Sequence, residues 1–140
     1  MTTESTLHGT CVAYDQSGLL IIGTSGSGKS GLALALMGMN AVLVADDRVI
    51  VTNDEGVLFA QCPPAIKGLI EARGIGLLAA KSQPSTLITC VVDLDQIEPD
   101  RLPPNRSLTI LGVEIDLVFG KDRPNLAAAL NQLMKIGRVE

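Results

Sequence analysis

Three observations in the sequence predict an α/β fold built on a mixed β-sheet with flanking helices. An apolar run at 19–22 leads into a glycine-rich loop at 23–30, and a helical stretch follows directly. Hydrophobic residues make up 46% of the chain, with only 2 Phe, 1 Tyr and 0 Trp, so Val, Ile, Leu and Ala must form a core of buried strands. A further strand precedes the run at 19–22, and a tight turn makes the two antiparallel neighbours.

The glycine-rich loop GTSGSGKS matches the pattern G-x-x-x-x-G-K-[ST] of a phosphate-binding loop, or P-loop. Its glycines allow a tight turn in which backbone N–H groups surround a phosphate at the positive end of a helix. The lysine can reach the β- and γ-phosphates of a nucleotide, and the last serine can bind Mg²⁺. The alternative is a purely structural turn, which is rare between such flanks. The predicted phosphate-binding residues are Gly23, Thr24, Ser25, Gly26, Ser27, Gly28, Lys29 and Ser30.

The elements next to the P-loop follow from apolar runs and turn residues. A first strand is predicted at 7–14, and the turn Asp15-Gln16-Ser17-Gly18 returns it into the strand at 19–22. The helix begins near Lys29 and ends by Asn40, a residue that can terminate a helix. The P-loop strand is therefore the second strand of a hairpin.

Downstream of the helix, the apolar strand 41–45 ends on Asp46 and Asp47, at the kind of strand end where α/β proteins bind ligands. We expect one domain over residues 1–140, because this length suffices for one hydrophobic core. The remaining predicted elements are a hairpin at 49–52 and 57–60, a helical turn at 65–69, a central strand at 86–94, an exposed connection at 95–107, strands at 108–111 and 113–119, and a final helix with Pro124 in its first turn.

Charge and targeting signals exclude several classes of protein. The net charge is −4 and Lys and Arg do not cluster, which argues against a nucleic-acid partner. No apolar run reaches the ~18 residues of a membrane span, and the amino terminus lacks a basic-then-apolar leader. We therefore expect no membrane partner and a cytoplasmic location. Cys11, Cys62 and Cys90 lack metal-binding spacing and are expected to be reduced and mostly buried.

Three further groups could meet at the P-loop, namely the Asp46-Asp47 pair, the segment EARGIG at 71–76, and His8. Phosphoryl transfer needs Mg²⁺, in-line positioning and positive charge around the transferred group, and a carboxylate is the usual proton acceptor. One aspartate could act as the base and the other could hold the metal or its water. The alternatives are solvated carboxylates in a turn, a surface cross-strand or intersubunit pair for Glu71 and Arg73, and a structural histidine.

Together these motifs resemble the C-terminal catalytic domain of the bacterial HPr kinase/phosphorylases. The resemblance covers nearly the whole chain and implies a fold similar to that of the phosphoenolpyruvate carboxykinases. The chain departs from the family at Ala79-Ala80, where Asp or Asn is usual, in the loop 120–125, and in the absence of the family's amino-terminal domain. The matching residues are His8-Gly9, the P-loop 23–30, Leu43-Val44-Ala45-Asp46-Asp47 and Glu71-Ala72-Arg73-Gly74-Ile75-Gly76.

The resemblance implies a kinase that uses ATP and Mg²⁺ to phosphorylate a serine of the phosphocarrier protein HPr or a similar small phosphocarrier, with phosphorolysis as the reverse reaction. It also implies a homo-hexamer. A nucleotide-binding regulatory module without phosphotransfer, or a P-loop kinase of a small metabolite, are the alternatives. The implied roles are the catalytic base for Asp46, phosphate contacts for Lys29 and Arg73, an active-site position for His8, and metal binding for Ser30 and Glu71. Asp47, the other carboxylate of the pair, is a further predicted metal-binding residue.

Overall fold

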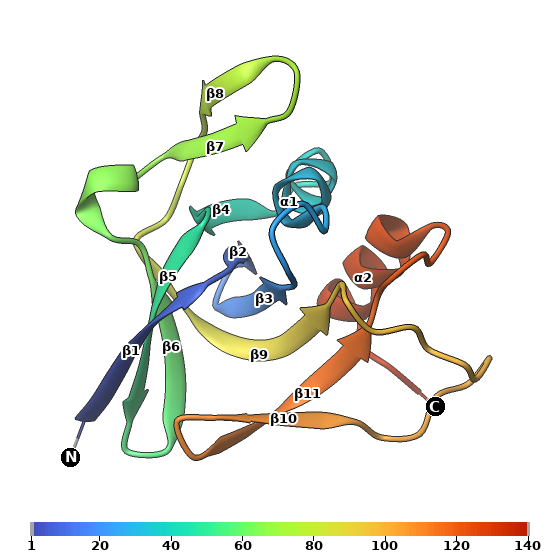
Figure 1. The fold of residues 1–140 in the computed structure, drawn as a ribbon. Helices are drawn as coiled ribbons and strands as arrows, with labels where there is room; N and C mark the ends of the chain where they lie inside the picture. The colour runs from blue at the N-terminus through green and yellow to red at the C-terminus, as the bar shows by residue number, and fades with distance from the viewer. Residues whose placement is uncertain (1, 140) are drawn as a thin grey trace.

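The computed structural model describes residues 2–139 (Figure 1). The first half of the chain contains β1 (Thr2–His8), β2 (Thr10–Tyr14), β3 (Ser17–Ile22), α1 (Lys29–Met37), β4 (Val42–Ala45), β5 (Arg48–Asp54) and β6 (Val57–Gln61). The second half contains the 3₁₀ turn η1 (Pro64–Ile66), β7 (Leu69–Ala72), β8 (Gly76–Ala79), β9 (Ser85–Asp93), β10 (Ser107–Ile110), β11 (Val113–Phe119) and α2 (Leu126–Lys135). This composition confirms the predicted α/β class.

Within residues 2–139, nine strands form one mixed sheet in the order β1-β5-β6-β9-β3-β2-β4, which β11 and β10 extend from β9. β9 is central, as its β-branched sequence predicts, and it pairs in parallel with β3 and β11 and antiparallel with β6. β3 pairs antiparallel with β2, which confirms the hairpin before the P-loop. β7 and β8 pair only with each other, in a separate two-stranded sheet that stands away from the large one (Figure 1).

The two faces of the large sheet carry different cores, because successive side chains of a strand point to opposite faces. Val12, Leu19 and Ile21 pack with apolar residues of α1 and α2. Cys11 and Leu20, which alternate with them, pack instead with residues of β5, β6 and β11. Both helices therefore cover one face, and the curled sheet closes over the other (Figure 1).

The predicted strand at 7–14 is wrong in its extent, because the chain forms two strands that separate at Gly9. β1 begins at Thr2 and pairs with β5, whereas β2 pairs with β3 and β4. A Cβ atom on Gly9 would lie 2.9 Å from the carbonyl oxygen of Ile21, so the chain can cross here only as glycine. This crossing brings the end of β1 next to the end of β4.

Two other expectations have clear outcomes. The final helix begins at Leu126, two residues beyond Pro124, because Asn125 is left-handed at φ 59° and cannot continue a helical turn from the proline. All three cysteines in the described part of the chain are free, and the burial of Cys11 and Cys90 confirms that the cysteines are mostly buried. No helix among residues 2–139 is both long and apolar enough to span a bilayer.

Candidate active site

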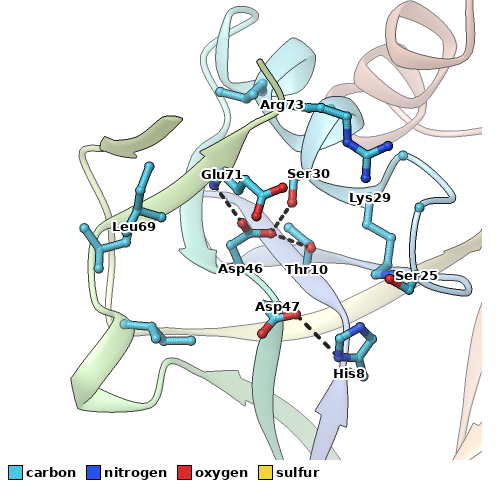
Figure 2. A pocket seen from close by; sticks show the side chains of 16 residues that line it. His8, Thr10, Ser25, Lys29, Ser30, Asp46, Asp47, Leu69, Glu71 and Arg73 are labelled. Atoms are coloured by element: carbon cyan, nitrogen blue, oxygen red, sulfur yellow. Dashed lines mark hydrogen bonds and ion pairs between the residues drawn. The ribbon is translucent and has the colours of Figure 1, made fainter. Parts of the chain in front are cut away.

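A cavity of about 480 Å³ lies between the P-loop, the ends of β1, β2 and β4, and the β7–β8 hairpin (Figure 2). Most of the predicted site residues meet there: His8, Ser25, Gly26, Gly28, Lys29, Ser30, Asp46, Asp47, Glu71 and Arg73 all line it. Gly23, Thr24 and Ser27 belong to the same loop but do not line the cavity. Sequence reasoning missed Thr10, whose only local signal is a hydroxyl among apolar residues of a buried strand.

The P-loop is built as the motif predicts. Gly28 is left-handed at φ 100° and caps α1 without a side-chain hydrogen bond, which leaves the backbone N–H groups of the first turn available to an anion. Lys29 is buried, and its Nζ donates to the carbonyl oxygens of Gly23 and Thr24 at 2.9 and 3.1 Å. These contacts use two of the three N–H donors of the ammonium, and the third is available to a phosphate oxygen.

A carboxylate from outside the motif fixes the start of the loop. Asp95, which follows β9, accepts hydrogen bonds from the backbone N–H and the hydroxyl of Thr24 at 2.8 and 3.0 Å. β9 runs parallel to β3, so both strands end at the same edge of the sheet. The central strand therefore supports the P-loop as well as the core, a contact between residues 71 positions apart that no local pattern indicates.

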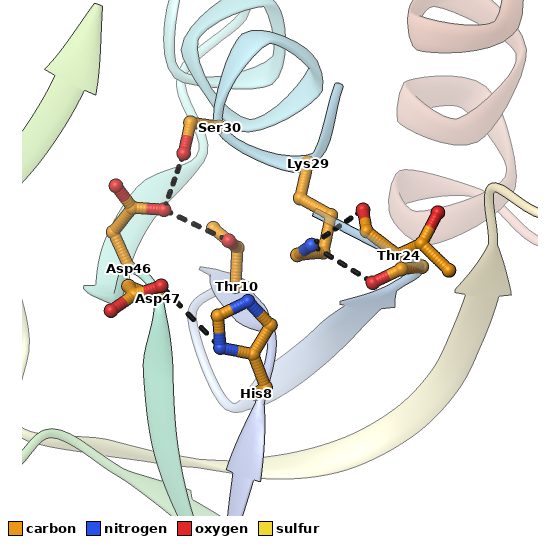
Figure 3. A network of polar contacts seen from close by, with 8 residues as sticks. His8, Thr10, Thr24, Lys29, Ser30, Asp46 and Asp47 are labelled. Atoms are coloured by element: carbon orange, nitrogen blue, oxygen red, sulfur yellow. Dashed lines mark hydrogen bonds and ion pairs between the residues drawn. The ribbon is translucent and has the colours of Figure 1, made fainter. Parts of the chain in front are cut away.

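Figure 3 shows Asp46 between the side chains of Ser30 and Thr10. Its side chain is 7% exposed, and Oδ1 accepts hydrogen bonds from the hydroxyls of Ser30 at 2.7 Å and Thr10 at 2.9 Å. Its Oδ2 accepts the backbone N–H of Glu71 at 3.0 Å. One carboxylate thus ties together β2, the first turn of α1, the end of β4, and β7.

Asp47 lies in a different environment although it is the next residue. It is left-handed at φ 75°, and its carboxylate is 65% exposed with Oδ1 3.5 Å from Nδ1 of His8. The backbone N–H of Gly9 donates to the Asp47 carbonyl oxygen at 3.2 Å, which holds the two turns together. Because β4 has ended at Ala45, strand alternation no longer separates the two aspartates, and both line the cavity.

Glu71 and Arg73 come from the β7–β8 hairpin. Glu71 is on β7, Arg73 is in the turn that follows, and Figure 2 shows both side chains pointing into the cavity. The described residues contain no ion pair between them, so the cross-strand form of the surface-pair alternative is not present within this chain. The hairpin therefore adds one carboxylate and one guanidinium opposite the P-loop.

The chemistry of this site suits a nucleotide with Mg²⁺. Hydroxyl and carboxylate oxygens of Ser30, Asp46 and Glu71 are hard ligands of the kind Mg²⁺ prefers. No three His, Cys, Asp or Glu side chains within residues 2–139 form a group that could hold a metal ion by themselves. The Oγ atom of Ser27 in the loop is buried, with no hydrogen-bond partner in the described part of the chain. The residues present therefore fit a Mg²⁺–nucleotide.

Comparisons with known proteins agree with this geometry. A family model described as the HPr serine kinase C-terminal domain matches residues 1–118. Curated proteins named HPr kinase/phosphorylase from Chloroherpeton thalassium and Caldicellulosiruptor bescii are each 36% identical to the chain, over 91% and 93% of its length. The protein of the same name from Mycoplasmopsis pulmonis is 38% identical over 68% of the chain.

A solved structure described as the Hpr(Ser) kinase/phosphatase from Coxiella burnetii has the same fold. It matches with a TM-score of 0.80 and 25% sequence identity, and the match covers 94% of both chains. The chain spans only 44%, 48% and 33% of the curated relatives from Chloroherpeton, Caldicellulosiruptor and Mycoplasmopsis, respectively. The similarity thus concerns one part of those longer proteins.

Proposed function

Because this chain belongs to the HPr serine kinase C-terminal domain family, we propose that it is an ATP- and Mg²⁺-dependent kinase that phosphorylates a serine of HPr or a related small phosphocarrier protein. One observation carries the proposal: a single cavity holds the lysine and serine of a P-loop together with an accessible carboxylate, that of Asp47. Phosphate binding and proton acceptance can therefore occur side by side, which is what transfer to a hydroxyl requires.

The P-loop holds the donor in this proposal. Backbone N–H groups at the start of α1 and the Lys29 ammonium bind the phosphates, and the Ser30 hydroxyl and the Glu71 carboxylate hold Mg²⁺. Mg²⁺ would neutralise charge on the phosphates as the bond to the leaving group breaks. Arg73, on the opposite wall, adds positive charge next to the transferred phosphoryl group.

For the two aspartates, the geometry favours roles opposite to those expected from the sequence. A general base needs a free lone pair within reach of an incoming hydroxyl. Asp46 is buried and accepts three hydrogen bonds, so it suits the task of orienting Ser30 and the metal. Asp47 is exposed at the cavity and suits the task of taking the serine proton. His8 lies beside this carboxylate, with its Nδ1 3.5 Å from Oδ1 of Asp47.

In the forward reaction, Asp47 accepts the proton of the serine hydroxyl while the serine oxygen bonds to the γ-phosphorus and the bond to ADP breaks. In the reverse reaction proposed by analogy with the phosphorylases, inorganic phosphate takes the phosphoryl group from phosphoserine as pyrophosphate. Asp47 then returns the proton to the serine oxygen. The same carboxylate can thus act as base in one direction and as acid in the other.

Three further proposals remain: residues 1–140 act as a single kinase domain, the protein acts in the cytoplasm, and, on the family resemblance alone, it forms a homo-hexamer. The hexamer is tested by light scattering on the purified protein, with a mass about six times that of the 14.7 kDa chain expected.

The function is tested by incubating the protein with Mg-ATP and purified HPr and locating phosphate by mass spectrometry. We expect one phosphoserine on HPr, none without Mg²⁺, and none with the Lys29→Ala protein, which should also bind nucleotide poorly. Nucleotide binding without any phosphoserine would refute the kinase and favour the regulatory module.

A further inference from the structure

Among the polar side chains of the described cavity wall, that of Thr10 is the one that neither the motifs nor the proposed roles explain. It is on β2, its side chain is 0% exposed, and its hydroxyl donates to Oδ1 of Asp46 at 2.9 Å. A buried threonine costs stability relative to an apolar residue of the same shape unless its hydroxyl is satisfied. The hydroxyl of Thr10 is thus satisfied by a carboxylate of the proposed site.

A β-bulge between β2 and β4 brings Thr10 and Asp46 together. Val12 lies opposite Leu43, but Cys11 lies opposite Ala45, so the register shifts by one residue. If this register continues, Thr10 lies opposite Asp46. As a result, Val44 and Ala45 both pack on the face away from α1, and Asp46 turns toward α1 and Ser30. Without the bulge, strand alternation would direct Asp46 into the opposite core.

The hydroxyl of Thr10 occupies one of the accepting positions of the Asp46 carboxylate. An ionised carboxylate can accept about four hydrogen bonds, two on each oxygen. Oδ1 of Asp46 accepts from Thr10 and Ser30, and Oδ2 accepts from the backbone N–H of Glu71. One accepting position is left, and it is on Oδ2, the oxygen beside the Glu71 backbone.

We infer that Thr10 is a positioning residue for Mg²⁺: its hydroxyl saturates Oδ1 of Asp46 and so fixes the orientations of Ser30 and Glu71 toward the metal. Ser30 donates its proton to Oδ1, which leaves its lone pairs free for the ion. The inference rests on the proposed use of Mg²⁺ at this site, but not on HPr as the substrate. Groups that orient metal ligands in this way typically change metal affinity 10- to 100-fold when removed.

The test measures Mg²⁺ affinity without phosphate transfer. Binding of a fluorescent ADP analogue is followed as Mg²⁺ is titrated, for the wild type, Thr10→Val, which keeps the shape but removes the hydroxyl, and Thr10→Ser, which restores it. We expect Thr10→Val to raise the half-saturating Mg²⁺ concentration about 10-fold, and Thr10→Ser to stay within about 3-fold of the wild type. Binding of the analogue in EDTA should be the same for all three.

Thr86→Val is the matched control, because Thr86 is also buried, on β9, and its hydroxyl donates to the carbonyl oxygen of Leu87. It can lower the melting temperature but should leave the Mg²⁺ titration unchanged. An unchanged titration for Thr10→Val, or an equal shift for Thr86→Val, would overturn the inference. If Thr10→Val does not fold, Thr10→Cys replaces it, because a thiol is a weaker donor of similar size. Thr10→Cys should then raise the half-saturating Mg²⁺ concentration more than Thr10→Ser does. Equal shifts for these two variants would overturn the inference.

The outcome is independent of the HPr assay, since no phosphocarrier is present. A shift in the Mg²⁺ titration together with no phosphoserine on HPr would refute the proposed kinase and leave the role of Thr10 standing. Phosphoserine on HPr with no shift for Thr10→Val would support the proposed kinase and refute the role of Thr10.

Discussion

The two walls of the cavity are built in contrasting ways. We call the first wall the platform; it consists of the P-loop, the first turn of α1, and the adjoining ends of β2 and β4. Its polar side chains are buried and bonded to one another, as in Asp46 with Thr10 and Ser30. The second wall is the β7–β8 hairpin, which pairs only with itself and exposes 79% of Ile75 and 67% of Leu77.

The fixed platform and the exposed hairpin suit two different tasks in the proposed reaction. A nucleotide and Mg²⁺ need donors and ligands that are fixed before binding, because small geometric errors weaken them strongly. An incoming protein needs an accessible wall that can adjust to it. Ile70, 1% exposed and packed with apolar residues of α1, and the Asp46–Glu71 hydrogen bond anchor the hairpin to the platform. We therefore expect platform changes to affect folding and ligand geometry, and hairpin changes to affect transfer.

The largest effect should come from Asp47, the accessible carboxylate at the edge of the platform. Asp47→Asn removes the proposed base and should lower the rate of phosphate transfer to HPr about 10²- to 10⁴-fold, with nucleotide affinity nearly unchanged. The rate is measured in single-turnover reactions with purified HPr. Asp54→Asn, the same substitution in the β5–β6 hairpin, is the control. A transfer rate within threefold of the wild type for Asp47→Asn would show that another group takes the proton.

The next effect should come from the hairpin itself. Arg73→Gln removes a cation from the cavity and should lower the transfer rate about 10²- to 10³-fold, the usual cost of losing one stabilising donor in the transition state. Because Arg73 is exposed and unpaired with Glu71, the melting temperature should not change. Arg101→Gln, in the exposed connection after β9, is the matched control. If Arg73→Gln instead unfolds the protein, the hairpin is structural and the contrast between the walls fails.

Much of this arrangement is encoded locally, and the rest depends on pairing across the sheet. The P-loop and α1 were predicted because a dense motif and an apolar helix follow each other directly. The acidic strand end was predicted because the apolar run 41–45 stops at Asp46. By contrast, the break at Gly9 and the bulge beside Cys11 arise from contacts with distant strands, so an uninterrupted apolar pattern hides them. That bulge decides which aspartate is buried, which explains why the residues alone, without the family resemblance, could not separate the two aspartate roles.

A third pair of variants compares stability in the two walls. Leu36→Ala removes a fully buried side chain of α1 beneath the platform and should lower the free energy of unfolding by about 2–5 kcal/mol. Leu77→Ala truncates an exposed side chain of β8 and should change it by less than about 0.5 kcal/mol. Urea unfolding followed by circular dichroism gives both values. Similar losses for the two variants would mean that the hairpin is as tightly packed as the platform.

The smallest effect is expected at Cys11, which follows Thr10 on β2 and reports whether the platform opens. Burial disfavours the thiolate and raises the pKa of Cys11 to about 12, and it raises that of Cys90 to about 11. At pH 9 only about one Cys11 in a thousand is a thiolate, so iodoacetamide should leave it unmodified between pH 7 and 9, as read by mass spectrometry. Half-buried Cys62 is the internal control and should react first.

The raised pKa of Cys11 also has a consequence for stability. In the unfolded chain the thiol ionises near its ordinary pKa, whereas in the folded chain it stays protonated up to about pH 12. The contribution of the buried Cys11 thiol to the free energy of unfolding is therefore complete below about pH 8.5 and declines as the pH rises toward 12. Cys11→Ala should flatten this alkaline decline in the urea midpoint. Rapid alkylation of Cys11 at pH 8 in the folded protein would show instead that β2 opens readily, and the platform could not then hold Thr10 and Asp46 in fixed positions.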